Sequence, residues 1–255
     1  QDLYVADVDA ATTTLSFPLL ANVHGKVYFS YVETETIELP LLQNVSGDVY
    51  FGSWYGGYSL RLPSLQLVGG YFYVYSYAST LDVGNLESVG SYFNLDYNYY
   101  LDTVNASSLQ TVGSYLSIYY VRDSSLTELS FVSLTHVGSY LSIRRNPSIL
   151  LLSFESLVYV GGYLYVADND ALTVAIFNSL TSIESTTYCG ASGEYENVCV
   201  DANNALEVVA FRSLDYDSVD VAVSSDASRS RRADNIPHSH TKKSCRHLFY
   251  FLWRR

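Results

Sequence analysis

The 255-residue chain is poor in charged residues, in cysteine and in long apolar runs, and each shortage argues against a class of protein. Charged residues make up 16% of the chain, which is low for a cytosolic protein. No run of 18 apolar residues occurs, so we expect no membrane span. The three cysteines are not spaced as zinc ligands, and His24 and His136 lie in different repeats, so we expect no metal ion or other cofactor.

Positive charge is also scarce in most of the chain. Residues 1–225 hold 6 of the 14 Lys and Arg residues but 24 of the 26 Asp and Glu residues, a net charge near −18. Such a body repels nucleic acid and anionic membrane surfaces, so neither is an expected partner. The composition reverses in residues 226–255, where 8 basic residues face 2 acidic ones.

An internal repeat dominates the rest of the sequence. The segment Val137-Gly-Ser-Tyr-Leu-Ser-Ile143 recurs with small changes, for example from Val112 to Ile118 and from Val68 to Val74. The first Val or Ile of the copies stands at positions 23, 45, 68, 89, 112, 137, 160 and 183, so the copies are 21 to 25 residues apart. A period this regular predicts a solenoid, in which each repeat forms one coil.

Each part of the repeat has a physical reason. The alternation in Leu-x-Ile predicts a short strand with both apolar side chains inward, and the preceding Gly marks a tight bend or a close approach of two coils. An Asn three residues after the strand suits a turn, and stacked copies would bond to one another. The second half of each repeat supplies an opposite apolar wall. An aromatic stack is expected there from Phe17, Phe131, Phe154, Phe177 and Phe211.

The predicted fold is therefore mainly β, a right-handed β-helix of about ten coils over residues 1–225, followed by a basic C-terminal tail over residues 226–255. At about 4.8 Å per coil the rod is roughly 45 Å long. The tail matches no repeat. We consider it as a cap on the last coil, a processed segment or a disordered extension.

The repeat V/I-x-G-x-L-x-I-x-x-N-x-x-L-x-x-L, as in Leu134 to Ile149, resembles that of the receptor L domain, which forms the ligand-binding lobes of insulin- and epidermal-growth-factor-type receptors. It is also similar to the repeat of fungal sporulation-type cell-wall proteins. The resemblance covers about residues 3–223. It implies a right-handed β-helix related to leucine-rich repeats, located at a cell surface or in a wall.

With Leu and Ile inward, the residues between them point outward and stack into columns. One column is almost entirely tyrosine, from Tyr71 to Tyr163. Tyrosine combines a rigid apolar ring with a polar tip, which suits recognition, but identical rings also stabilise stacked strands by packing. We favour a structural role for this uniform column. The columns in which other residues interrupt tyrosine give the ligand-binding candidates, which are Tyr50, Tyr73, Tyr75, Asn94, Asp96, Tyr119, Arg144 and Tyr165.

An enzymatic role finds little support. Asp96 and Arg144 stand two coils apart with no second carboxylate beside Asp96, whereas inverting glycosidases need a pair. Asp168 and Asp170 flank a turn and are interpreted as solvated turn residues. The motifs G-x-S-x-G and H-E-x-x-H and a P-loop are all absent, so we expect no catalytic residues.

Several features favour an extracellular location. Cys189 and Cys199 flank a small loop and suit a disulfide, although two buried thiols are the alternative. Asn44 and Asn105 begin N-glycosylation sequons in a eukaryotic host. Gln1 lies close to the first repeat strand, as in a mature secreted protein. The tail segment with Arg229, Arg231 and Arg232 resembles a dibasic processing site, with a plain basic linker as the alternative.

The sequence therefore predicts a non-catalytic extracellular surface protein. In the favoured hypothesis it is an adhesion or recognition module that binds a protein or a glycan through its Tyr/Ser-rich sheet face. The alternative is a structural subunit of a cell wall or an extracellular filament, which would self-associate. A carbohydrate-active enzyme ranks third.

Overall fold

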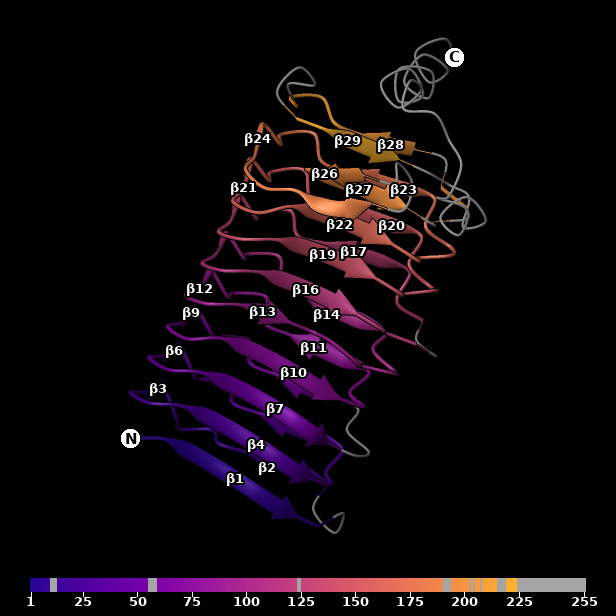
Figure 1. Ribbon diagram of the computed structural model, residues 1–255. Helices are drawn as coiled ribbons and strands as arrows, with labels where there is room; N and C mark the ends of the chain where they lie inside the picture. The colour runs from indigo at the N-terminus through magenta and orange to yellow at the C-terminus, as the bar shows by residue number, and fades with distance from the viewer. Residues whose placement is uncertain are drawn as a thin grey trace.

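Three short strands follow one another in each of the first eight turns, and successive turns stack into a rod (Figure 1). The computed structural model describes residues 1–9, 13–54, 59–122, 125–189, 194–201, 203, 205–206, 208–214 and 219–223. Within these residues it is a parallel β-solenoid of about nine turns and contains no helix. The basic tail, with the Arg229, Arg231 and Arg232 candidates, lies outside the described residues.

One ten-stranded sheet, here called wall A, includes the longest strands, and all its neighbouring strands are parallel. Its strands, in spatial order, are β1 (Leu3–Val8), β4 (Val27–Val32), β7 (Val49–Trp54), β10 (Phe72–Ser76), β13 (Phe93–Asn94), β16 (Leu116–Tyr119), β19 (Leu141–Arg144), β22 (Leu164–Ala167), β27 (Val198–Asp201) and β29 (Val221–Val223). They correspond to the predicted Leu-x-Ile segments.

Two further walls complete each turn. Wall B consists of β2 (Thr14–Ser16), β5 (Thr36–Glu38), β8 (Ser59–Arg61), β11 (Thr80–Asp82) and β14 (Thr103–Asn105), and then a separate sheet of β17 (Glu128–Ser130), β20 (Leu151–Ser153), β23 (Val174–Ile176) and β28 (Val208–Ala210). Wall C consists of β3 (Asn22–Val23), β6 (Asn44–Val45), β9 (Leu67–Val68), β12 (Ser88–Val89), β15 (Thr111–Val112), β18 (His136–Val137), β21 (Tyr159–Val160) and β24 (Ser182–Ile183). The Val before the repeat's Gly thus belongs to a sheet of its own, which the sequence did not predict.

The core contains one inward phenylalanine in each of nine turns, but not always on the same wall. Phe131, Phe154, Phe177 and Phe211 stack in wall B with ring centroids 5.3–5.4 Å apart, as predicted. Phe17 does not join them. It meets Phe29 edge-on, because the equivalent positions of the next four turns hold Leu39, Leu62, Val83 and Ala106, while Phe29, Phe51, Phe72 and Phe93 fill the core from wall A.

The repeat's glycines allow the turns to approach closely. A Cβ atom on Gly47 would lie 2.7 Å from the carbonyl oxygen of Gly25. Those on Gly90, Gly113 and Gly138 would each overlap the carbonyl oxygen of the glycine one turn earlier. The predicted close backbone approach is present, and side chains larger than hydrogen are excluded there by a neighbouring backbone.

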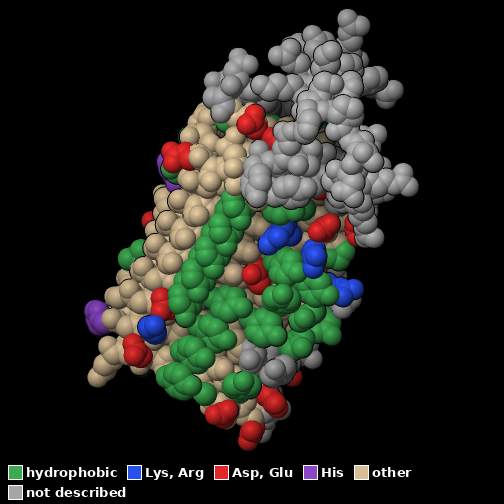
Figure 2. Space-filling view, viewed as in Figure 1, with side chains coloured by type: hydrophobic (Ala, Val, Ile, Leu, Met, Phe, Trp, Pro, Cys, Tyr) green, Lys and Arg blue, Asp and Glu red, His purple; other side chains and the backbone are tan. Residues whose placement is uncertain are grey.

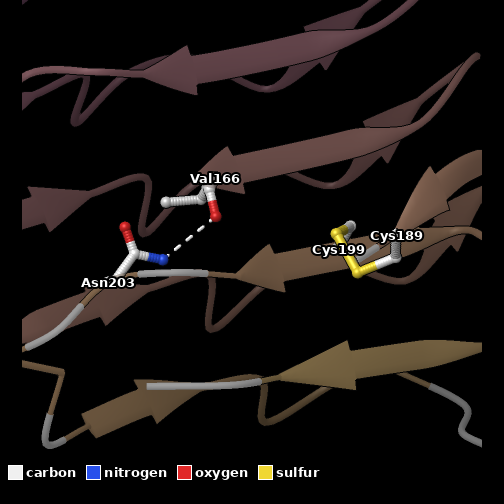
Figure 3. Close-up of a disulfide and its surroundings, with 4 residues drawn as sticks. All are labelled: Val166, Cys189, Cys199 and Asn203. Atoms are coloured by element: carbon white, nitrogen blue, oxygen red, sulfur yellow. Dashed lines mark hydrogen bonds between the residues drawn. A yellow bond between two sulfur atoms is a disulfide. The ribbon is translucent and has the colours of Figure 1, made fainter. Parts of the chain in front are cut away.

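A ladder of buried asparagines follows wall A. Asn169 accepts bonds from the backbone N–H and the side-chain amide of Asn146, both 3.1 Å long, and donates to the Ile143 carbonyl at 2.9 Å. In the same way, Asn203 accepts bonds from the backbone N–H and the side-chain amide of Asn169. It donates to the Val166 carbonyl at 3.1 Å (Figure 3). Each amide therefore satisfies backbone groups that the bend leaves open, as expected from the sequence.

The last described turns carry a covalent link. An antiparallel hairpin of β25 (Thr187–Cys189) and β26 (Glu194–Glu196) precedes β27. Cys189 and Cys199 form a disulfide with their Cα atoms 5.4 Å apart, which fastens the hairpin to wall A (Figure 3). Both cysteines are fully buried and pack against Tyr165.

Candidate recognition surface

The outer face of wall A consists of three columns of side chains whose register is fixed by the parallel pairing. The first column is Lys26, Asp48, Tyr71, Tyr92, Tyr115, Tyr140 and Tyr163. The second is Tyr4, Tyr28, Tyr50, Tyr73, Asn94, Ser117, Ser142 and Tyr165. The third is Ala6, Ser30, Gly52, Tyr75, Asp96, Tyr119, Arg144 and Ala167.

The five tyrosines of the first column form a continuous stack, here called the tyrosine ladder. Successive ring centroids from Tyr71 to Tyr163 are 4.7–5.1 Å apart and the rings are within 6° of parallel. Figure 2 shows a straight row of hydrophobic side chains along the rod. The inner rings have both faces covered by neighbours, so the ladder presents ring edges and hydroxyl groups. It stabilises the stack and cannot serve as a flat platform for a ligand ring.

Burial changes the acidity of the ladder's phenols. Partial burial, together with the neighbouring phenols, raises the pKa of Tyr92 and of Tyr140 to about 12. The pKa of Tyr71 and that of Tyr115 are raised in the same direction, again mainly by burial. These hydroxyl groups therefore stay protonated at neutral pH and can donate hydrogen bonds from the outer face.

The raised pKa values of Tyr92 and Tyr140 should make the stability of the folded chain depend on pH in the alkaline range. A tyrosine pKa of about 12 in the folded chain, against the ordinary 10.0, means that the folded state binds these protons more tightly than the unfolded chain. The stabilisation is complete below pH 10.0 and is lost as the pH rises through about 12. We expect the free energy of unfolding, measured in urea at a series of pH values, to fall over this interval.

The matched control is the double variant Tyr92→Phe, Tyr140→Phe. It keeps both rings of the ladder but removes the two ionising groups, so its unfolding free energy should fall less steeply over the same pH interval. An equal slope in the variant and the original chain would show that the ladder phenols do not have the expected pKa values.

The second column changes character along the rod. Tyr4 stacks on Tyr28 with ring centroids 4.9 Å apart, and Tyr28 on Tyr50 at 4.6 Å, but Tyr73 is tilted by 44° from Tyr50. The next three turns hold Asn94, Ser117 and Ser142, which are only 7%, 6% and 2% exposed, before Tyr165 resumes the aromatic series. Three turns of short polar side chains are thus enclosed between tyrosines.

Asp96 lies beside this polar segment and is well supplied with donors. Its Oδ2 accepts from the Asn94 amide at 2.9 Å and its Oδ1 from the Ser117 hydroxyl at 2.9 Å. Burial raises the pKa of Asp96, while the hydrogen bonds from Asn94 and Ser117 and the charge of Arg144 act in the opposite direction. The structure thus brings three predicted site residues together, namely Asn94, Asp96 and Arg144.

Arginines and tyrosines gather at the neighbouring corner. The Arg144 guanidinium lies over the rings of Tyr119 and Tyr165, 5.4 and 5.2 Å from their centroids. Arg145 donates to the Tyr119 hydroxyl at 2.8 Å, and Arg122 donates to the hydroxyl of Tyr120 at 2.7 Å. We call Tyr119, Tyr120, Arg122, Arg144 and Arg145 the arginine–tyrosine corner. In Figure 2 blue side chains adjoin a green patch on this face.

Three members of this corner were missed by sequence reasoning. Tyr120, Arg122 and Arg145 follow the strands, whereas only strand positions were assigned to columns. Tyr120 and Arg145 adopt positive φ angles of 63° and 56°. Asp7, Tyr31 and Asp168 do the same at the equivalent bends, so this conformation belongs to the repeat. The available signal was the concentration of Arg residues in two adjacent repeats of an acidic body.

The other candidates lie apart from the corner. Tyr50 belongs to the N-terminal stack, and Tyr75 meets Tyr97 edge-on at 6.1 Å. Asn44 lies in wall C, where its amide donates to Asn22, and Asn105 lies in wall B, where its amide donates to Asp82. Both sequons thus stand away from wall A.

In the part of the chain that the structure describes, no helix is long and apolar enough to cross a membrane. No cluster of three or more His, Cys, Asp or Glu side chains there is placed to hold a metal ion.

Comparison of the chain with protein-family models, with curated protein sequences and with solved structures gives no match.

Proposed function

We propose that this chain is a non-catalytic recognition module that works outside the cell and binds a protein or a glycan through the outer face of wall A. The observation that carries the proposal is the arginine–tyrosine corner beside the polar segment of the second column. Tyrosine and arginine are the residues that dominate binding energy in recognition surfaces. Here stacking and hydrogen bonds hold them in fixed positions, so little side-chain freedom is lost on binding.

Three further features support the proposal. The sequons at Asn44 and Asn105 lie on walls C and B, so glycans attached there leave wall A open. A disulfide such as Cys189–Cys199 persists in oxidising compartments. The repeat resembles those of the receptor L domain and of fungal sporulation-type wall proteins, and both groups work at cell surfaces.

A binding screen with two variants tests the proposal. We expect the purified chain to bind at least one member of an array of glycans and extracellular proteins. Tyr119→Ala should weaken that binding about tenfold or more, because a central aromatic contact is removed. Tyr159→Ala, a half-buried tyrosine on wall C, is the matched control and should leave affinity unchanged. Urea unfolding of both variants separates lost contacts from lost folding.

The alternative function, a structural subunit of a wall or filament, gives a different result. In that case the chain would bind no ligand on the array, and light scattering would show assembly that grows with concentration. A chain that stays monomeric at high concentration and binds through wall A excludes this alternative.

A further inference from the structure

The arginine–tyrosine corner concentrates positive charge in a body that has very little of it. Residues 1–225 contain 6 basic residues, and three of them, Arg122, Arg144 and Arg145, belong to this corner. The exposed pair Arg145 and Asp168, 3.7 Å apart, is screened by water and neutralises Arg145 only weakly. Arg144 forms no ion pair with any carboxylate of the described residues.

Arg144 and Ser142 have hydrogen-bonding capacity that the fold does not use. The Nε atom of Arg144 and the Oγ atom of Ser142 are both buried and neither has a hydrogen-bond partner. The two residues are separated by one position on β19, so they share the outer face of wall A. A buried donor without a partner is destabilising, so a ligand oxygen that reaches these groups and accepts from them gains affinity.

Asp96 differs from Arg144 in this respect. Both of its carboxylate oxygens already accept hydrogen bonds from the sheet, from Asn94 and from Ser117. The groups at this site that lack a hydrogen-bond partner are therefore donors, and they belong to or lie beside the positively charged Arg144. An anionic group with oxygen acceptors matches them, and a guanidinium binds a carboxylate through parallel hydrogen bonds.

The surroundings restrict how densely charged such a ligand can be. The body carries 24 acidic against 6 basic residues, and at physiological ionic strength repulsion extends over a Debye length of about 8 Å. A polymer with an anion on every unit would meet this repulsion along most of the rod. A single carboxylate on an otherwise neutral ligand avoids it.

The face also distinguishes sugars from extended peptides. Peptides commonly bind by adding a strand to a free sheet edge, but β16 and β19 are each paired on both sides. The surface offers side chains alone, among them a row of protonated tyrosine hydroxyls about one turn apart. Hydroxyl groups of a sugar chain can bond to such a row.

We propose that Arg144, with the Ser142 hydroxyl, forms an anion-binding centre for the carboxylate of an acidic sugar residue within an otherwise neutral glycan. Tyr119 and Tyr165 hold the guanidinium in position, and Arg122 and Arg145 add longer-range attraction. This inference rests on the proposed recognition function and names its ligand class.

An array of carboxylated oligosaccharides, each printed beside its carboxyl-reduced neutral form, tests the inference. We expect at least one acidic oligosaccharide to bind about tenfold or more tightly than its reduced partner, as loss of a charge-assisted hydrogen bond implies. Arg144→Gln should abolish this preference, so that the acidic form binds no more tightly than its reduced partner. Arg144→Lys, which keeps the charge but loses the planar fork, should recover part of it.

Arg61→Gln is the matched control, since Arg61 is an exposed arginine on wall B that pairs with Glu38 at 3.7 Å. It should keep the full preference, and urea unfolding should show that every variant is folded. Equal binding of acidic and reduced forms throughout the array would overturn the inference while leaving the recognition function intact. Binding of an acidic protein, but of no glycan, would also overturn the sugar assignment. An absence of all binding, with assembly in solution, would remove the recognition function itself.

Discussion

Replacing Asn169 by alanine is expected to lower the free energy of unfolding by about 4 kcal/mol, because it leaves several buried groups without partners and each costs about 1–3 kcal/mol. Asn169 is fully buried. Its removal would take from the Ile143 carbonyl and the Asn146 backbone N–H the bonds described above. The Asn146 side-chain amide and the Asn203 Oδ1 would each lose one of two bonds. Urea unfolding followed by circular dichroism measures the change.

Two companion variants make this test specific. Asn85→Ala removes an exposed asparagine that donates to the Pro63 carbonyl at 2.6 Å, so it should cost less than about 1 kcal/mol. Asn169→Asp keeps the size of the side chain but replaces its two amide donors by a buried carboxylate, so it should be at least as damaging as alanine. A loss for Asn169→Ala no greater than that for Asn85→Ala would refute a structural role of the ladder.

The second large effect is expected at the glycines between turns. In Gly113→Ala the new Cβ atom would overlap the Gly90 carbonyl oxygen and lie 2.9 Å from its carbon, and both are backbone atoms that cannot rotate away. The turns cannot separate without lengthening bonds such as that from the Gly113 N–H to the Val89 carbonyl, now 2.9 Å. We expect a loss of about 3 kcal/mol, the upper range for overpacking.

Ser114→Ala provides the control for this substitution at the next position. Ser114 is half-buried, and its backbone N–H donates to the Ser91 carbonyl at 2.8 Å whatever side chain it carries. Its unfolding free energy should change by less than about 1 kcal/mol. If Gly113→Ala unfolds at the same urea concentration as Ser114→Ala, the turns are less tightly packed than the structure indicates.

Much of the fold could be predicted from the sequence because neighbours in a solenoid are residues one period apart. The 21–25-residue repeat therefore identified which residues meet, including the tyrosine ladder, the glycine contacts and the asparagine ladder. The same reasoning placed Leu141 and Ile143 inward and Ser142 outward. Each turn contacts only the turns before and after it, so these contacts join residues about one repeat apart. A repeat pattern in the sequence is therefore enough to predict them.

The arrangement of the walls could not be obtained in this way. Val137 and its equivalents form the separate wall C, because the bend at the following glycine divides what reads as one apolar segment. The interval between Val112 and Val137 is 25 residues, the longest in the series, and wall B is divided between β14 in the preceding turn and β17 in this one. Each of the nine turns packs one phenylalanine into the core, from wall A or from wall B, and no single column reveals this.

The sequence by itself determined the repeat, the inward and outward faces of each strand and the acidity of the body. Only the tertiary structure decided which polar groups the fold leaves without a hydrogen-bond partner. Asp96 is satisfied by Asn94 and Ser117, whereas Arg144 and Ser142 keep unused donors, although all of them occupy outward columns. The reason is that hydrogen bonding depends on the direction and length of each side chain, whereas the repeat period tells only which positions stack on one another.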